Sequence, residues 1–370
     1  MTTVENTHTS SHTSSHTSEA LVERLFAAVL ATMDVQAAYL GDRLGYYRAL
    51  AGGEALTSAE LAVRTGTAER YTREWLEQQA VSGFLTCDDE ADAARRRYTL
   101  PAGHAEALTD ELSPNHILPL AKLIAGAGKQ LDSLVAAYRD GGGVTWAEHG
   151  EDVREAQAAA NRPLFLGELG RDILPSIADV DAALRAGGRV ADIGCGHGWS
   201  AVGIALAYPA ATVDGYDTDA PSIAAARRNA AEAGVGDRVR FHLADPATAA
   251  AAGERYDAVF AFECIHDLPD PVAVLASMRA LAGAAAPVIV MDERVGETFA
   301  APGDEIERLM YGYSLVCCLA DGMAHEHSVG TGTVMRPSTL REYAVRAGYG
   351  GVDVLDAAND FFRFYRLTHS

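Results

Sequence analysis

The stretch that decides the fold is Arg189–Gly198, with the sequence RVADIGCGHG, in a chain of 370 residues. A short β-prone run is followed by three glycines at every second position, and a helical pattern then runs from Trp199 to Ala207. A strand that ends in a glycine turn and opens a helix is the first unit of a doubly wound α/β sheet. We therefore expect a mostly parallel sheet that starts here.

The alternation of strand and helix continues to the end of the chain. Further strands are expected at residues 212–216, 239–243, 258–262 and 288–291, with helices at 220–233 and 271–281. Residues 352–355 and 361–367 are expected to form an antiparallel hairpin around Asn359-Asp360 at the sheet edge. The predicted fold class is α/β, a seven-stranded, doubly wound, mostly parallel sheet behind an N-terminal helical winged-helix domain.

The winged-helix prediction comes from the segment before the sheet. Thr57 is placed to cap a short helix, residues 68–81 form a second amphipathic helix, and the polar segment 88–97 lies as a wing between two short strands. Residues 19–112 contain 9 arginines and no lysines against 16 acidic residues, whereas a DNA-binding module is locally basic. The Arg95–Arg97 run is the exception and fits a solvated wing tip. We expect this domain to form a homodimer and to bind no nucleic acid.

The whole chain divides into four expected regions. These are a disordered tail at residues 1–18, the winged-helix dimerisation domain at 19–112, a helical connector at 113–186 and the sheet domain at 187–370. A net charge of −21 disfavours nucleic acids and anionic membranes as partners. No apolar run reaches the ~20 residues of a membrane span, and no secretory signal is legible. Five scattered cysteines without a C-x-x-C spacing predict free thiols, no metal site and a cytoplasmic location.

The glycine turn by itself does not identify a ligand, since dinucleotide enzymes use a similar turn. Asp192 stands two residues before the first glycine, where its carboxylate repels a phosphate and attracts an ammonium or sulfonium group. S-adenosylmethionine carries both cations and no phosphate. Asp217, nineteen residues after Gly198, is placed at a strand end to bind two ribose hydroxyls, and Asp245 is placed to read an adenine amino group.

From about Arg189 onward the chain resembles the class I S-adenosylmethionine-dependent methyltransferases. That resemblance implies S-adenosyl-L-methionine as the cofactor and a Rossmann-like methyltransferase sheet. The expected cofactor-binding residues are Asp192, Gly194, Gly196 and Gly198 in the first motif, the ribose acid Asp217, the adenine-contact acid Asp245, and Phe262 at the end of the fourth strand.

The residues after the fourth strand point to the chemistry. His266-Asp267 stands at the carboxyl end of the sheet, where α/β enzymes place their reactive groups, and an imidazole can act as a base near neutral pH. With its winged helix, the chain resembles the small-molecule O-methyltransferases of plants and bacteria, whose base is the His of such a pair. Leu268 departs from that family, which commonly has Trp there. The resemblance also implies that Glu293, in Asp292-Glu293, orients the base; packing, cofactor contact or helix capping remain alternatives for His266 and Glu293.

The leading hypothesis is an enzyme that transfers a methyl group from S-adenosylmethionine to a hydroxyl oxygen of a small organic acceptor. An aromatic compound is one candidate for this acceptor. Two alternatives stay open: a winged-helix transcriptional regulator that senses the same cofactor, and a non-methylating enzyme that retains it. The insertion at residues 296–336 is a candidate wall of the acceptor pocket, or a helix packed on the N-terminal module. Trp146 and His149 are candidates to close over the cofactor.

Overall fold

The chain divides after Ala102 into two units, in a computed structural model that describes residues 16–357 and 359–369. Most of the tail expected at residues 1–18 lies outside the described residues. Helix α1 begins at Ser18, and the Thr17 side chain caps it by accepting a hydrogen bond from the Ala20 N–H at 3.1 Å. The helix thus starts at Ser18, the last residue of the expected tail.

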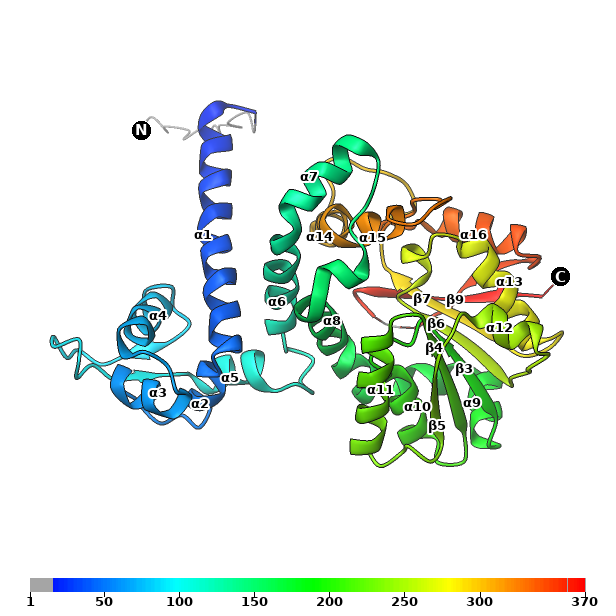
Figure 1. Cartoon of the computed structure of the whole chain (residues 1–370), viewed down its shortest axis with the longest axis horizontal. Coiled ribbons are helices and arrows are strands. Elements are labelled where there is room, and N and C mark those ends of the chain that lie inside the picture. The colour runs from blue at the N-terminus through cyan, green and yellow to red at the C-terminus, as the bar shows by residue number, and fades with distance from the viewer. Residues whose placement is uncertain (1–15, 358, 370) are drawn as a thin grey trace, which may run out of the picture. The chain divides into compact units, whose positions relative to one another are not determined.

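The first unit is the expected winged helix (Figure 1). The Thr57 side chain caps α3, as the sequence predicted, and Glu60 completes a capping box with it. The wing strands pair antiparallel, with Thr86 opposite Thr99. The elements of this unit are α1 (Ser18–Arg43), α2 (Tyr46–Leu50), α3 (Ser58–Thr65), α4 (Glu69–Val81), β1 (Thr86–Cys87) and β2 (Tyr98–Thr99).

A buried tryptophan joins the helices of the first unit. The Trp75 Nε1–H donates to the Ala37 carbonyl oxygen at 2.8 Å, and the ring lies 4.7 Å from that of Tyr46 and 5.2 Å from that of Tyr47. Because the indole supplies apolar area and a satisfied donor together, it fixes the C-terminal part of α1 against α4.

Residues 103–186 lie in the second unit together with the sheet. The helical stretch expected from residue 115 to 138 begins at Leu118 and is interrupted by a 3₁₀ turn. The single helix expected at 151–169 is wrong in its second part: after Pro163, which has no N–H for the α-helical ladder, the chain continues as a π-helix. The helical segments here are α5 (Ala102–Thr109), α6 (Leu118–Ala127), η1 (Gly128–Gln130), α7 (Leu131–Asp140), α8 (Trp146–Pro163), η2 (Leu164–Ile173), η3 (Leu174–Ser176) and α9 (Ala178–Arg185).

The sheet has seven strands in the order β5-β4-β3-β6-β7-β9-β8. Its first five strands are parallel, and β9 runs antiparallel to both β7 and β8 at the edge, as predicted. The predicted bounds of β5 and β6 are those observed. The strands are β3 (Arg189–Ile193), β4 (Thr212–Asp217), β5 (Val239–Leu243), β6 (Ala258–Phe262), β7 (Val288–Glu293), β8 (Gly351–Val354) and β9 (Phe362–Thr368).

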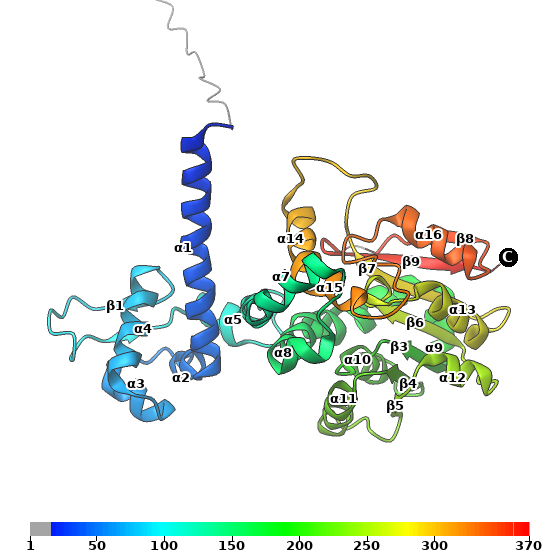
Figure 2. The ribbon, with the colours of Figure 1, turned by 45° about the horizontal axis from the view of Figure 1, so that its top comes forward.

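Helices cover both faces of the sheet (Figure 2). One face packs against α9, α10, α11 and η2, and the opposite face packs against α12, α13 and α16. Because successive residues of a strand face opposite sides, a central strand must then be apolar along its whole length, and all five residues of β6 are buried. The remaining helices are α10 (Trp199–Ala207), α11 (Ala220–Glu232), α12 (Pro246–Ala251), η4 (Ile265–Asp267), α13 (Pro271–Ala282), α14 (Glu305–Tyr313), η5 (Ser314–Cys318), α15 (Leu319–Met323) and α16 (Pro337–Arg346).

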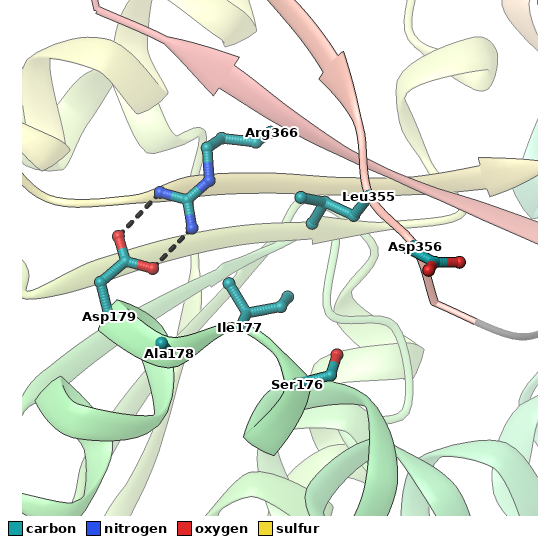
Figure 3. Close-up of a pocket in the computed structure, with 7 residues that line it drawn as sticks. All are labelled: Ser176, Ile177, Ala178, Asp179, Leu355, Asp356 and Arg366. Carbon is teal, nitrogen blue, oxygen red and sulfur yellow. Dashed lines mark hydrogen bonds and ion pairs between the residues drawn. The ribbon is translucent and has the colours of Figure 1, made fainter.

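A cavity of about 310 Å³ lies between the start of α9 and the ends of β8 and β9 (Figure 3). Asp179 and Arg366 form an ion pair across it, and Ile177 and Leu355 line its middle. None of the residues that the sequence analysis selected lines this cavity. The candidate site residues lie instead at the carboxyl edge of the parallel strands.

No helix within the described ranges combines the length and the apolar character that a membrane crossing requires.

Helix α10, which follows the glycine turn, approaches η2 very closely. A Cβ atom added at Gly203 would lie 2.1 Å from the carbonyl oxygen of Phe165, a distance that real side chains do not reach. Only glycine permits this contact between α10 and η2, and the contact holds the C-terminal end of α8 close to the glycine turn.

We predict that Gly203→Ala lowers the free energy of unfolding by about 1–3 kcal/mol, because the added methyl group forces α10 and η2 apart. Gly167→Ala is the matched control, since an added Cβ there meets nothing within 4 Å, and it should change stability by no more than about 1 kcal/mol. Urea unfolding followed by circular dichroism measures both. Equal losses in the two variants would contradict the close approach.

Candidate functional site

The glycine turn after β3 is packed at its ends and open in its middle. Gly194, Gly196 and Gly198 have φ angles of 67°, 49° and 77°, in the left-handed region that favours glycine. A Cβ at Gly194 would lie 2.6 Å from the Cys264 Sγ, and one at Gly198 would lie 2.5 Å from the Phe241 ring. A Cβ at Gly196 would meet nothing within 4 Å. A ligand can therefore approach the backbone at the centre of the turn.

Asp217, the last residue of β4, is fastened to the same turn. The Gly196 N–H donates to its Oδ2 and the Asp219 N–H donates to its Oδ1, both at 2.8 Å. Burial raises the pKa of Asp217, and these backbone bonds only partly oppose it. Each carboxylate oxygen keeps a lone pair, so the group can accept hydrogen bonds from a ligand diol.

Asp192 lies beneath the turn and is 1% exposed. The Ser200 hydroxyl donates to its Oδ2 at 2.6 Å. Burial raises the pKa of Asp192 to about 7, the nearby charge of Asp217 adds to the effect, and the bond from Ser200 opposes it. The ion pairs of the described residues include none with Asp192, so its charge lacks a protein cation.

Asp245 lies beyond the end of β5, on the same edge of the sheet. The neighbouring Ala244 N–H donates to the Asp217 carbonyl oxygen at 3.0 Å, which places Asp245 next to the end of β4. Its own carboxylate is exposed and caps α12 by accepting from the Ala247 N–H at 2.7 Å.

Phe262 has a different environment from the other expected cofactor residues. Its ring packs against Phe165 and Phe260, with centroid distances of 5.6 and 5.3 Å, and is 6% exposed. The structure thus brings the glycines, Asp192, Asp217 and Asp245 to one edge, and places the Phe262 ring in the core beside them.

His266 lies in η4 and is 2% exposed. Its Nδ1 is hydrogen-bonded to the Asp292 Oδ1 at 3.0 Å and lies 3.1 Å from the Glu293 Oε2. Its Nε2 lies 3.1 Å from the Asp267 Oδ1. The end of β7 thus supplies two carboxylates to one ring nitrogen, and Asp292, rather than the expected Glu293, makes the hydrogen bond.

The carboxylates decide the protonation of this cluster. Burial by itself lowers the pKa of His266, but the three neighbouring carboxylates outweigh it, and the pKa is raised well above its ordinary value. Burial also raises the pKa of Glu293 well above its usual range. For Asp292, the charge of His266 and its hydrogen bonds exceed the effect of burial and hold the pKa low. The resting arrangement is a charged Asp292 that holds a protonated imidazole.

Several buried polar atoms around His266 make no hydrogen bond within the described residues, although two of them lie at ion-pair distance from the ring. They include the Asp267 Oδ1, the Glu293 Oε2 and both ring nitrogens of His149. Buried polar atoms are normally hydrogen-bonded, so unpaired ones gathered near a reactive group fit a binding site for polar ligand atoms. His149 is 3% exposed, and burial lowers its pKa, which keeps the ring neutral.

The same cluster has the spacing of a metal site. Ligand atoms of His266, Asp267 and Cys318 lie within 4.8 Å of one another, as do those of His266, Asp292 and Glu293. Both groups share His266, whose two nitrogens already lie 3.0–3.1 Å from carboxylate oxygens. Ion pairing alone therefore accounts for the arrangement.

The sequence analysis did not identify Glu263 and Asn161. The Asn161 Nδ2 donates to the Glu263 Oε2, although the two residues are 102 positions apart. Glu263 has a φ of 54°, and only it and His327 among the described residues other than glycine have a positive φ. No local sequence pattern indicates such a pair.

The insertion at residues 296–336 lies beside the catalytic candidate. It forms α14, η5 and α15, and α15 packs on η4, which carries His266. Cys317 in η5 is buried with Leu123 of α6 and Val153 of α8, so the insertion packs within the second unit. Arg336 closes the segment by donating to the Gly296 carbonyl oxygen at 2.7 Å and to Glu307 at 2.6 Å.

Two family models match parts of the chain. Residues 190–283 match a model described as a methyltransferase domain, and residues 31–110 match one described as an Rv2258c-like winged HTH domain. A 27-O-demethylrifamycin SV methyltransferase of Amycolatopsis mediterranei (strain S699) is 38% identical over 87 residues, which are 24% of this chain and 32% of that protein. The aligned part thus spans about a third of that relative's length.

Solved structures resemble the chain over almost its whole length. The mitomycin 7-O-methyltransferase MmcR has a TM-score of 0.71 at 19% identity, with 95% of this chain and 98% of that chain covered. Human N-acetylserotonin methyltransferase, solved in complex with SAM, has a TM-score of 0.69 at 16% identity, with 96% and 99% covered. At these identities the likeness establishes the fold. Residues 190–283 thus match a methyltransferase domain, residues 31–110 match a winged HTH domain, and the likeness in fold extends over almost the whole chain.

Proposed function

We propose that this protein transfers a methyl group from S-adenosylmethionine to a hydroxyl oxygen of a small organic acceptor, with His266 as the general base. The observation that carries the proposal is the buried imidazole whose Nδ1 is held by Asp292, at the same sheet edge as a glycine turn that is bound by the Asp217 carboxylate. The expected residues fit the cofactor, since the turn is open at Gly196 and Asp192 and Asp217 supply uncompensated negative charge there.

His266 and the three carboxylates around it have distinct roles in this proposal. When bound, S-adenosylmethionine supplies an electrophilic methyl group. The Asp292 carboxylate holds the Nδ1–H of His266 and so leaves the Nε2, which lies 3.1 Å from the Asp267 Oδ1, as the nitrogen that serves the acceptor. The Nε2, once deprotonated, takes the hydroxyl proton as the acceptor oxygen forms its bond to the methyl carbon and the sulfur–carbon bond breaks. Asp292 and Asp267 stabilise the imidazolium that forms, because their carboxylate oxygens lie 3.0 and 3.1 Å from the ring nitrogens, and Glu293 helps to orient the ring from 3.1 Å.

The insertion is the proposed wall of the acceptor pocket. It packs on η4 beside His266, and Tyr313 at the end of α14 has a buried hydroxyl without a hydrogen-bond partner among the described residues. An aromatic ring and an unpaired hydroxyl together suit a ring-bearing acceptor with polar substituents. Methylation at oxygen is favoured over nitrogen or carbon because the site holds a base for an O–H proton.

We propose that the first unit forms a homodimer and does not bind nucleic acid. The N-terminal two thirds of α1 exposes large apolar side chains, whereas a monomeric surface helix would be polar there. The wing arginines, which a regulator would use on phosphates, pair with carboxylates instead: Arg96 with Glu77 and Arg97 with Glu60. The exposed side chains of α1 are Leu21, Val22, Leu25, Phe26, Val29, Leu30 and Met33.

A cytoplasmic location agrees with the five cysteines, all of which are free thiols.

We predict that Asp192→Asn stabilises the ligand-free protein at pH 8 but weakens binding of S-adenosylhomocysteine. The folded-state pKa of about 7 exceeds the ordinary 3.8, so ionised Asp192 destabilises the fold, and this cost develops as the pH rises from about 4 to 7. The variant should gain about 1–4 kcal/mol at pH 8 and almost nothing at pH 4. Unfolding curves at both pH values and calorimetric titration at pH 8 measure the two effects. Stabilisation that does not depend on pH would contradict the assignment.

We predict that His266→Ala lowers turnover by roughly 10²–10⁴-fold and leaves affinity for S-adenosylhomocysteine within a few-fold of wild type. Because carboxylates raise the pKa of His266, wild-type kcat/KM should increase with pH through a value above 6.5. S-adenosylhomocysteine production with a panel of hydroxylated aromatic compounds provides the rate. His325→Ala, at an exposed position, is the control and should keep wild-type turnover. Unchanged turnover in His266→Ala would exclude it as the base.

We predict that the double variant Leu25→Glu, Phe26→Glu converts a dimer into a monomer, because two charges cannot be buried in an apolar helix interface. Light scattering after size-exclusion chromatography gives the mass. Val63→Glu, at an isolated exposed apolar position on α3, should stay dimeric. A wild-type mass of one chain, or a dimeric double variant, would refute this interface.

A further inference from the structure

Glu263 stands where β6 meets the glycine turn. In the parallel pairing of β3 and β6, Ile193 is opposite Ala261, so two residues further Glu263 is level with Cys195 inside the turn. The adjacent Cys264 is locked to β3, because its Sγ donates to the Ile193 carbonyl oxygen at 3.3 Å. Glu263 is therefore held directly beside the backbone that the donor is expected to approach.

The backbone of Glu263 adopts a conformation that a side chain disfavours. Its φ of 54° lies in the left-handed region, where a Cβ crowds the backbone. Strain of this kind persists where the surrounding structure maintains it, and it is concentrated at ligand-binding sites. A glycine at this position would relieve the strain and would lose the carboxylate.

No lysine or arginine of the described residues pairs with that carboxylate, and the protonated His266 is the protein charge that acts on it. The Asn161 Nδ2 donates to it, and Gln157 is a second amide donor, but the ion pairs of the described residues include none with Glu263. Burial raises the pKa of Glu263 to about 7, although Asn161 and the charge of His266 oppose the rise. Part of the residue stays accessible, so a ligand cation can reach it. Neutral amides orient the carboxylate and leave its charge for a ligand.

We propose that Glu263 is the binding residue for the α-ammonium group of the methionine portion of the donor. The inference rests on the proposed function and adds a contact that the glycine motif and its flanking acids do not contain. Asp217 serves the ribose end of the turn, and Glu263 serves the amino-acid end, where β6 leads to His266. Asn161 is a positioning residue that fixes the Glu263 carboxylate from α8.

Two ligands separate this contact from the rest of the pocket. S-adenosylhomocysteine carries the ammonium group, and 5′-methylthioadenosine keeps the adenosine and the sulfur but has no amino acid. Calorimetric titration of the whole chain with each ligand should show that Glu263→Gln raises the Kd of S-adenosylhomocysteine by about 10- to 100-fold, the range of a hydrogen bond between charged groups. The Kd of 5′-methylthioadenosine should stay within twofold. Glutamine keeps the size and the backbone conformation of Glu263, and Glu232→Gln on the exposed surface of α11 is the matched control.

The outcomes are distinct. An unchanged Kd for S-adenosylhomocysteine in Glu263→Gln, or an equal loss for both ligands, would overturn the proposal. A loss confined to S-adenosylmethionine would also overturn it, because it would place the carboxylate at the sulfonium. Asn161→Ala should weaken S-adenosylhomocysteine by a smaller factor and again spare 5′-methylthioadenosine. If the wild-type chain bound neither ligand, the proposed function would fail, and that result is separate from any effect of the variants.

Discussion

Buried negative charge without protein cations is the constraint on which this site depends. Burial raises the pKa values of Asp192 and Glu263 to about 7 and that of Asp321 to about 6. Each of these carboxylates would be more stable with a cation beside it, yet no lysine or arginine of the described residues forms an ion pair with any of the three. The fold thus carries an electrostatic cost at the carboxyl edge of its parallel strands, and a positively charged ligand relieves it. A pyrophosphate would increase it.

The same edge of the sheet holds His266, a cation that is surrounded by carboxylates. Around His266 the carboxylates exceed what one imidazole can neutralise, and the ring is held in its protonated form. Asp292 is hydrogen-bonded to the Nδ1 of His266. The Asp267 Oδ1 lies 3.1 Å from the Nε2 but makes no hydrogen bond within the described residues. In the proposed function, donor binding and proton removal both rely on carboxylates placed at the ends of β4, β6 and β7.

The sequence predicted those parts of the molecule that local patterns determine. The predictions of β5, of β6 and of the helix cap at Thr57 are confirmed, because apolar runs and cap residues are local signals. The π-helix after Pro163 was not predicted, because a helical sequence pattern does not distinguish it from an α-helix. In the structure it follows the missing N–H of Pro163 and packs against α10 at Gly203. Within the site, the glycines and their acids could be found from spacing. The Glu263–Asn161 contact could not be found from spacing, because the two residues are 102 positions apart. The hydrogen bond between His266 and Asp292 could not be predicted either, because it depends on side-chain geometry at the end of β7.

The closure of the insertion by Arg336 has a consequence for diversification. One guanidinium joins the Gly296 carbonyl oxygen to Glu307, so the two ends of the segment are anchored before its residues reach η4. Lengthening a loop between fixed ends costs little conformational entropy, about 0.6 kcal/mol for each doubling. The largely exposed stretch 297–304 is therefore the part of the segment that can be lengthened at little cost, whereas η5 and α15 are fixed by their packing on α6, α8 and η4.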